Sequence, residues 1–222
     1  MAANTAFGMS CLGVENRMNI WLYSILFVSG FFLSNAKGAG FNNMEHKIIL
    51  LPIGKVDGWV LDILEKDLAK TFECKIERHM PIDLPGGAYN PERGQHYSSL
   101  ILKKVHELIE VEKQDKVFGI TDVDLYTAGL NFVFGEAELG GQSAIISLTR
   151  LRQSYYSLPE NKTIFAERTI KEAVHELGHV FGLGHCPVPE CVMYFSNSLL
   201  DTDKKSVSFC PRCRARWQKS IR

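Results

Sequence analysis

The chain has 222 residues, 45% of them hydrophobic, and its 25 basic and 25 acidic side chains leave no formal net charge. This length and composition suit one domain with a sizeable core. The even charge balance gives no indication of nucleic-acid binding, and the sequence contains no internal repeat or low-complexity segment.

Residues 1–43 differ in character from the rest of the chain. Residues 20–33 form a nearly continuous apolar run, which is short for a membrane span but has the length of a signal-peptide core. The only basic residue before this run, Arg17, lies close to Glu15, and Met44 offers a second start. Residues 1–43 are therefore either a targeting segment or an extension from a misplaced start codon, and we expect membrane association only if they are retained.

Hydrophobic periodicity predicts strands and helices that alternate through the body of the chain. The predicted strands are residues 46–53, 74–82, 116–125, 131–139 and 143–148. The predicted helices are residues 59–72 and 97–111, and a turn-rich loop covers residues 84–95. These elements predict an α+β fold in which a mixed sheet packs against helices.

The helix predicted over residues 167–181 carries the first part of the most specific motif in the chain, HELGHVFGLGH at residues 175–185. His175 and His179 lie one helical turn apart and can bind a single metal ion. Glu176 points beside them, where a carboxylate can take a proton from a zinc-bound water without binding the metal itself. The motif therefore predicts a catalytic zinc site with a general base.

The last part of the motif turns the chain back toward the same ion. Gly182 allows a sharp backbone turn at a conformation that is costly for residues with a Cβ atom. This turn returns His185 as the third ligand. Cys186, the next residue, is an alternative third ligand, but that assignment would leave the cysteine set described below one ligand short.

Four of the six cysteines follow the third histidine. They are Cys186, Cys191, Cys210 and Cys213. Two close pairs of cysteines can hold a structural zinc, because four thiolates leave no open coordination position. We expect this zinc to hold together a short C-terminal lobe that has few apolar residues. Two disulfides are the alternative, since an exported protein forms them equally well.

Met193, between the cysteine pairs, completes a pattern that resembles a known family. HExxHxxGxxH followed by a methionine turn marks the metzincin metalloproteases, and the added four-cysteine set resembles the archaemetzincin branch. The resemblance covers residues 44–222 and implies a single metzincin-like catalytic domain of the α+β class. Within it, an upper subdomain would span about 44–182 and a small zinc-stapled C-terminal lobe about 183–222.

By position, the resemblance implies two zinc ions per chain, one catalytic and one structural. The implied catalytic ligands are His175, His179 and His185. Glu176 would be the general base and Met193 the hydrophobic floor beneath the metal, while the four cysteines would bind the structural zinc. Several metzincins have a tyrosine two residues after this methionine, whereas Tyr194 follows it directly, so we interpret Tyr194 as a packing residue, with oxyanion stabilisation as the lesser alternative.

The same resemblance implies an edge strand that borders the active-site cleft. Residues 132–139, or the run that begins at Ser143, are the candidates, and an ordinary internal hairpin is the alternative. An exposed strand edge can pair with the backbone of a peptide and present one bond to the metal.

These features together predict a zinc-dependent metallopeptidase that hydrolyses peptide bonds through a zinc-bound water activated by Glu176. We expect a peptide or protein substrate, a monomer and no nucleic-acid partner. One alternative is a zinc-binding protein without turnover, which would not need Glu176. The other is a nucleic-acid-binding zinc ribbon that uses the basic tail at residues 204–222, which we otherwise expect to form a solvated helix.

Cysteine usage bears on the compartment. A four-thiolate zinc site favours a reducing environment, so the cytoplasm is the favoured location. Export, or membrane anchoring through residues 20–33, is the alternative.

Overall fold

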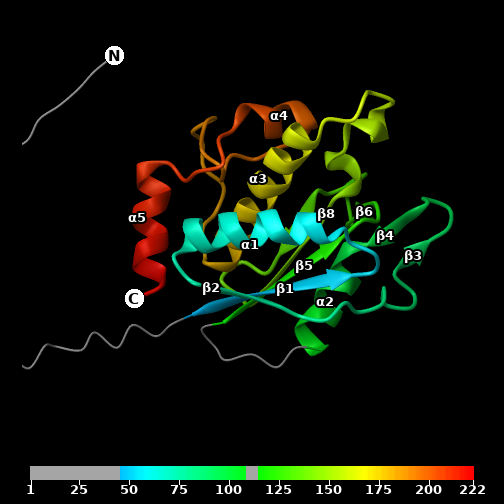
Figure 1. Cartoon of the computed structure of the whole chain (residues 1–222), viewed down its shortest axis with the longest axis horizontal. Coiled ribbons are helices and arrows are strands. Elements are labelled where there is room, and N and C mark those ends of the chain that lie inside the picture. The colour runs from blue at the N-terminus through cyan, green and yellow to red at the C-terminus, as the bar shows by residue number, and fades with distance from the viewer. Residues whose placement is uncertain (1–45, 109–114) are drawn as a thin grey trace, which may run out of the picture. The chain divides into compact units, whose positions relative to one another are not determined.

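The computed structural model describes residues 46–108 and 115–222, and a five-stranded mixed sheet lies at the centre of this part of the chain (Figure 1). The strand order is β2-β1-β5-β8-β7, in which β7 is antiparallel to β8 and the other neighbours are parallel. The strands are β1 (Lys47–Ile53), β2 (Lys75–Arg78), β5 (Lys116–Thr121), β7 (Gly135–Ala137) and β8 (Ser143–Ser147). A second, smaller sheet has the order β3-β4-β6 and contains β3 (Tyr89–Asn90), β4 (Gln95–Tyr97) and β6 (Leu125–Tyr126).

Helices cover both faces of the large sheet. On one face, α1 (Gly58–Phe72) and α3 (Lys162–Val180) share a buried core with Leu50 of β1. On the other face, α2 (Ser98–Leu108) packs against Leu51, the next residue of the same strand. Successive side chains of a strand point to opposite faces, so a strand that is covered on both sides must be apolar throughout. This explains the continuous apolar sequence of β1.

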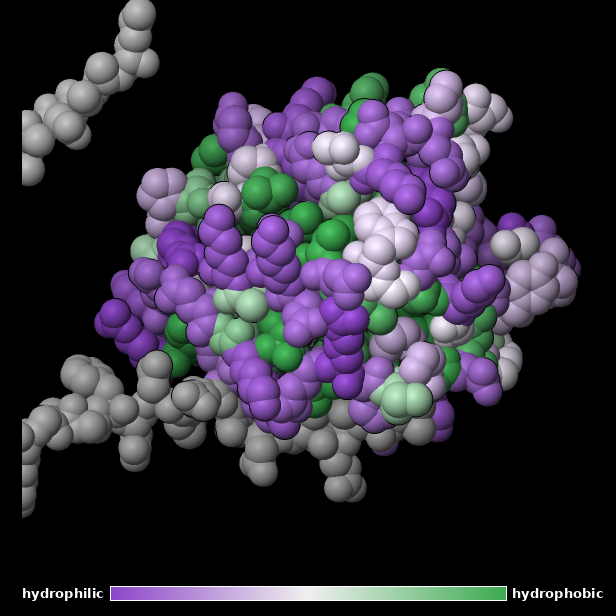
Figure 2. Space-filling model, viewed as in Figure 1, coloured by the Kyte–Doolittle hydropathy of each residue, from purple (hydrophilic) through white to green (hydrophobic). Residues whose placement is uncertain are grey.

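Two short 3-10 helices lie between β8 and α3, and two short α-helices follow α3. They are η1 (Thr149–Leu151), η2 (Gln153–Tyr156), α4 (Leu199–Lys204) and α5 (Pro211–Ser220). The face of the molecule seen in Figure 1 is hydrophilic over most of its area, with hydrophobic residues in smaller patches between (Figure 2). Among the described residues, none of the helices has the length and apolar character that crossing a membrane requires.

The predicted α+β fold is confirmed, with differences in strand length. Of the run predicted as a strand over residues 74–82, only β2 is a regular strand. Met80 beyond it is 77% exposed, and Ile82 forms an isolated bridge with Ile53. Pro81 has no backbone N–H to donate to a neighbouring strand, which limits pairing at that point. The predicted helix over residues 97–111 is α2, and its last three predicted positions lie outside the described residues, as do residues 1–43.

The run predicted as a strand over residues 131–139 pairs with both sheets. Val133 forms an isolated bridge with Leu125 of the small sheet, and only Gly135–Ala137 pair with β8. β7 ends the sheet order, so the first candidate for the edge strand is confirmed, and the run from Ser143 is the internal strand β8. β7 and β8 do form an antiparallel hairpin, but one of its strands is the edge of the sheet, so the alternative of an internal hairpin is wrong.

The C-terminal segment packs into the main core. Trp217 of α5 is fully buried, and its ring lies 5.9 Å from that of Phe72 at the end of α1. Phe181, just after α3, stacks on Phe72 with ring centres 5.2 Å apart and lies 6.4 Å from the ring of Trp217. The helix predicted in the basic tail is present, but it buries Trp217 and Cys213 and is not solvated on all sides.

Candidate metal centres

The structure brings the three motif histidines together at the C-terminal end of α3. His175 and His179 project from the helix and His185 from the loop after it, with one ring nitrogen of each within 4.8 Å of the others. His175 Nε2 and His179 Nε2 are 3.1 Å apart. Two nitrogens bound to one tetrahedral zinc at about 2.05 Å would be about 3.3 Å apart.

Hydrogen bonds at the far side of two rings fix which nitrogen faces the centre. His175 Nδ1 donates to the carbonyl oxygen of Val192 at 2.8 Å, and His179 Nδ1 donates to that of Leu183 at 2.7 Å. A carbonyl oxygen can only accept, so in the neutral rings both Nε2 atoms carry lone pairs. Two lone pairs that face each other at 3.1 Å need a cation between them. The arrangement fits a zinc ion.

The surroundings keep these histidines neutral, which is the form that binds metal. Burial lowers the pKa of His175 well below its ordinary value, and the positive charge of Lys205 adds to this effect. Burial also lowers the pKa of His179 and of His185, and the positive charge of Lys205 contributes to the lowering at both rings.

The turn after α3 follows the predicted geometry. Gly182 has a φ of +85°, in the left-handed region that favours glycine. The N–H groups of Gly182 and of Gly140, in the β7–β8 turn, both donate to His179 O, at 2.8 and 2.9 Å. The edge hairpin is thereby fixed to the end of the helix that carries two of the histidines.

The side chain of Glu176, on α3, points toward the edge strand β7. This side chain is buried, and a Cβ atom placed on Gly135 of β7 would lie 2.6 Å from Glu176 Cγ. Only glycine at position 135 leaves room for the carboxylate. Burial raises the pKa of Glu176 well above its ordinary value, and the negative charge of Glu172 adds to the rise.

A cleft of about 410 Å³ opens above these groups. It is lined by the three histidines, by β7 and by the segment that follows the methionine turn. Within that segment Phe195 lies against His185, with ring centres 4.8 Å apart, while Tyr194 is not among the lining residues. The interpretation of Tyr194 as a packing residue is compatible with this position.

Met193 packs against α3 at Gly178. It is fully buried, and a Cβ atom on Gly178, between the two helical histidines, would collide with its sulfur. The absence of a side chain at position 178 therefore lets the methionine reach the helix. This contact supports the predicted floor beneath the metal.

The four cysteines form the second cluster. Their sulfur atoms lie within 4.8 Å of one another, and Cys186 Sγ is 3.8 Å from Cys210 Sγ. Two sulfurs bound to one tetrahedral zinc at about 2.3 Å would be about 3.8 Å apart, whereas a disulfide requires about 2.05 Å. The N–H of Cys210 also donates to Cys191 Sγ at 3.3 Å, and such donors stabilise thiolate charge. The donor set fits a zinc ion.

One loop connects the two clusters. His185 and Cys186 are neighbours in the chain, and the N–H of Cys186 donates to Met193 O at 2.9 Å. Val192, which accepts the hydrogen bond from His175, lies directly after Cys191. Movement of the cysteine cluster would therefore displace partners of the histidine cluster.

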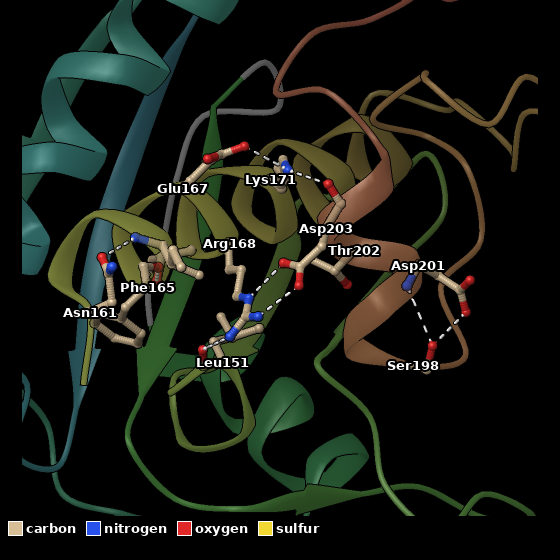
Figure 3. A network of polar contacts seen from close by, with 12 residues as sticks. Leu151, Asn161, Phe165, Glu167, Arg168, Lys171, Ser198, Asp201, Thr202 and Asp203 are labelled. Carbon is tan, nitrogen blue, oxygen red and sulfur yellow. Dashed lines mark hydrogen bonds and ion pairs between the residues drawn. The ribbon is translucent and has the colours of Figure 1, made fainter. Parts of the chain in front are cut away.

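A polar network that the sequence analysis missed joins α3 to α4. Lys205, just after α4, forms a buried ion pair with Glu172 of α3, with Nζ 3.0 Å from Oε1. Further along the same contact, Arg168 binds both carboxylate oxygens of Asp203 at 2.7 Å (Figure 3). The spacing of Glu172 four residues before Glu176 was an available signal for the first pair, but nothing local indicated its partner.

Comparison with known proteins gives consistent matches. The sequence model of Peptidase family M54 matches residues 62–219. The archaemetzincin of Methanocaldococcus jannaschii is 47% identical over 177 residues, which are 79% of this chain and 94% of that protein. The archaemetzincin of Pyrococcus furiosus is 41% identical over 183 residues, which are 80% of this chain and 95% of that protein. The crystal structure of archaemetzincin from Methanopyrus kandleri has a TM-score of 0.70 and 38% identity to this chain, and covers 80% of it and 96% of its own length.

Proposed function

Because the chain belongs to peptidase family M54, the archaemetzincin family of zinc metallopeptidases, we propose that His175, His179 and His185 bind its catalytic zinc and that Glu176 is its general base. The observation that carries this assignment is the pair of lone-pair nitrogens 3.1 Å apart on His175 and His179, with Glu176 beside them in the cleft.

The three histidines would hold the metal, and the protein around them sets their protonation. Each Nδ1 proton of His175 and His179 is held by a backbone carbonyl, so Nε2 stays free to bind. When bound there, zinc supplies a Lewis acid that acidifies water and polarises a peptide carbonyl.

Glu176 moves the proton. Its carboxylate has no hydrogen bond or ion pair within residues 46–108 and 115–222, so its oxygens are free to accept a proton from water at the cleft. The raised pKa of this buried carboxyl makes it a better proton acceptor than an exposed glutamate. The same oxygen can then donate the proton to the leaving amine, and no covalent intermediate with the protein is needed.

A peptide substrate would bind along the edge of β7. β7 ends the sheet and lines the cleft, so its outer side can pair with an extended backbone as an added strand. Such pairing would use main-chain groups and would leave sequence preference to the side chains around the cleft.

We assign the second zinc to the four cysteines, as a structural ion. Four sulfur ligands would complete the usual coordination of a structural zinc, so this site would have no open position for chemistry. It would fix the C-terminal lobe and, through the loop from Cys186 to Met193, the floor beneath the histidines.

Replacing Glu176 by Gln tests the assignment. The amide keeps the shape of the side chain but cannot take a proton, so we expect kcat to fall roughly 10²- to 10⁴-fold while the zinc content is unchanged. Cleavage is measured by mass spectrometry on a peptide library and zinc by elemental analysis.

The matched control is Glu167→Gln, on the same helix but outside the cleft, which should keep both activity and zinc. A Glu176→Gln protein that cleaves like the wild type would exclude Glu176 as the base. A wild-type protein that binds zinc but cleaves no member of the library would favour the zinc-binding alternative.

A further inference from the structure

Glu172, which lines the cleft, forms an ion pair with Lys205, and both side chains are shielded from solvent. The two side chains are 3% and 0% exposed, and the hydroxyl of Thr202 donates to the same Glu172 oxygen at 3.0 Å. Taking two charges out of water carries a desolvation penalty that well-packed apolar side chains of similar volume avoid. Stability alone therefore does not explain why the two charges are there.

The position of Glu172 relative to Glu176 suggests a role for the pair. The two glutamates are one turn apart on α3, and both line the cleft. Glu172 is held by Lys205 and Thr202, whereas the Glu176 carboxylate has no hydrogen bond or ion pair in the described part of the chain. Two identical side chains thus acquire different roles from their surroundings.

The third glutamate of the cleft is held as well. Glu136 of β7 accepts hydrogen bonds from the hydroxyls of Ser98 and Ser99, at the start of α2. Of the glutamates that line the cleft, Glu176 is therefore the one whose carboxylate is left unbound.

Release of Glu172 would disturb this arrangement. Without Lys205, its carboxylate would be a buried anion with no counter-ion, three residues along the helix from a zinc-binding histidine. Carboxylates are themselves good zinc ligands. A freed Glu172 would therefore turn toward the metal and compete with Glu176 and with the substrate for the open side of the centre.

We propose that Lys205 is a positioning residue: with Thr202 it holds the Glu172 carboxylate against the α4 segment and so leaves Glu176 as the free carboxylate beside the catalytic centre. The inference rests on the function proposed above for Glu176 and the three histidines.

The same α3–α4 contact contains a matched control (Figure 3). Arg168 bonds to both oxygens of Asp203 at 2.7 Å and donates to Leu151 O at 3.2 Å, and Lys171 donates to Asp203 O at 3.1 Å. Arg168 does not line the cleft. Its replacement weakens the docking of α4 on α3 without releasing a carboxylate near the centre.

The experiment compares Lys205→Met, Glu172→Gln, the double variant and Arg168→Met in the full chain. Each is loaded with zinc for kinetics and with cobalt(II) for visible absorption, which reports the ligands of the ion. We expect Lys205→Met to lower kcat by about tenfold or more, with a much smaller change in KM, and to shift the cobalt spectrum. Adding Glu172→Gln to Lys205→Met should restore the wild-type kcat and cobalt spectrum, because an amide is a poor competitor for the metal.

Arg168→Met should lower the melting temperature but leave kcat and the cobalt spectrum of the folded protein unchanged. A Lys205→Met protein with wild-type kcat and spectrum would overturn the proposal, and so would a double variant no better than the single one. If Lys205→Met does not fold, Thr202→Val replaces it: the proposal requires a smaller spectral shift in the same direction, reversed by Glu172→Gln, and is wrong if no shift occurs.

The spectrum also separates this inference from the proposed function. If the wild-type protein cleaves no peptide, the proposed function fails, while the cobalt spectra still report whether Lys205 keeps Glu172 away from the metal. If the wild type is active and the spectra of all variants agree, only the positioning role fails.

Discussion

Gly135 is the residue at which the edge strand comes closest to the proposed general base. A Cβ atom there would lie 2.6 Å from Glu176 Cγ and 2.7 Å from the carbonyl oxygen of Ile145. The first contact involves the side chain that must be placed accurately, and the second involves backbone that cannot easily move. An added methyl group would therefore push Glu176 out of position.

We expect Gly135→Ala to lower kcat by roughly 10²-fold, because a displacement of about 1 Å at a catalytic group has an effect of this size. The zinc content should be unchanged, since Gly135 is not a ligand. The measurement is steady-state cleavage of one peptide, with zinc determined on the same sample. Gly86→Ala is the control, because no atom lies within 4 Å of a Cβ at that position; equal kcat values for the two variants would contradict the expectation.

At the residue scale, the sequence predicted the groups whose chemistry is encoded by short spacing. The histidines and cysteines fall within two regular patterns, and the structure brings each set together. Gly135, Glu172 and Lys205 were missed, because their importance comes from contacts between distant segments. Thr202 and Glu172, for example, are 30 positions apart in the chain and share one hydrogen bond.

At the scale of elements, α3 begins with a cap that no catalytic pattern suggests. The side chain of Asn161 accepts hydrogen bonds from the N–H groups of Thr163 and Ile164, both at 3.0 Å. These two groups would otherwise lack partners, since the first N–H groups of a helix have none within it. The cap is about 20 Å along the helix from His175.

Removing this cap should destabilise the fold without changing the chemistry. We expect Asn161→Ala to lower the free energy of unfolding by about 1 kcal/mol, measured by chemical denaturation of the zinc-loaded protein. Asn161→Asp, which keeps an acceptor at the N-terminus of the helix, should be close to the wild type. A change in kcat of the folded Ala variant would show that the start of α3 affects the cleft, contrary to this expectation.

The elements themselves were predicted with uneven success, for physical reasons. α1, α3 and β1 have long periodic or continuous apolar patterns, and each is present; α1 and β1 match their predicted ranges closely, whereas α3 begins five residues earlier than predicted. β2 and β7 lie at the two edges of the sheet and are shorter than predicted. The length of an edge strand depends on where its single neighbour stops pairing, which the sequence of the strand does not contain.

At the scale of the whole molecule, the two proposed zinc sites are mechanically connected. The C-terminal helix α5 supplies Cys213 to one cluster and Trp217 to the main core, so the lobe is fixed at two points. From the cysteine cluster, Cys186 leads directly to His185 on one side and, through its hydrogen bond, to Met193 on the other. An ion held by the cysteines would therefore also support an ion held by the histidines.

Cys213→Ser tests this connection, because Cys213 is remote in sequence from the histidines and can affect them only through the cluster. We expect loss of the structural zinc and a decrease of several kcal/mol in the free energy of unfolding. The catalytic zinc should also bind roughly 10- to 100-fold more weakly, since the third ligand and the carbonyl partner of His175 are no longer fixed. Zinc per chain, zinc affinity by chelator competition and thermal unfolding are measured on the same preparation.

Cys74→Ser is the matched control, because Cys74 is a partly buried free cysteine that belongs to neither cluster. It should retain both ions. If Cys213→Ser loses one zinc while the affinity of the other and kcat stay at wild-type values, the sites are independent and the lobe serves stability alone. If the affinity for the catalytic zinc and kcat decline together, the cysteine cluster is part of what holds the third histidine in place. The fold of the lobe then cannot be separated from the chemistry of the cleft.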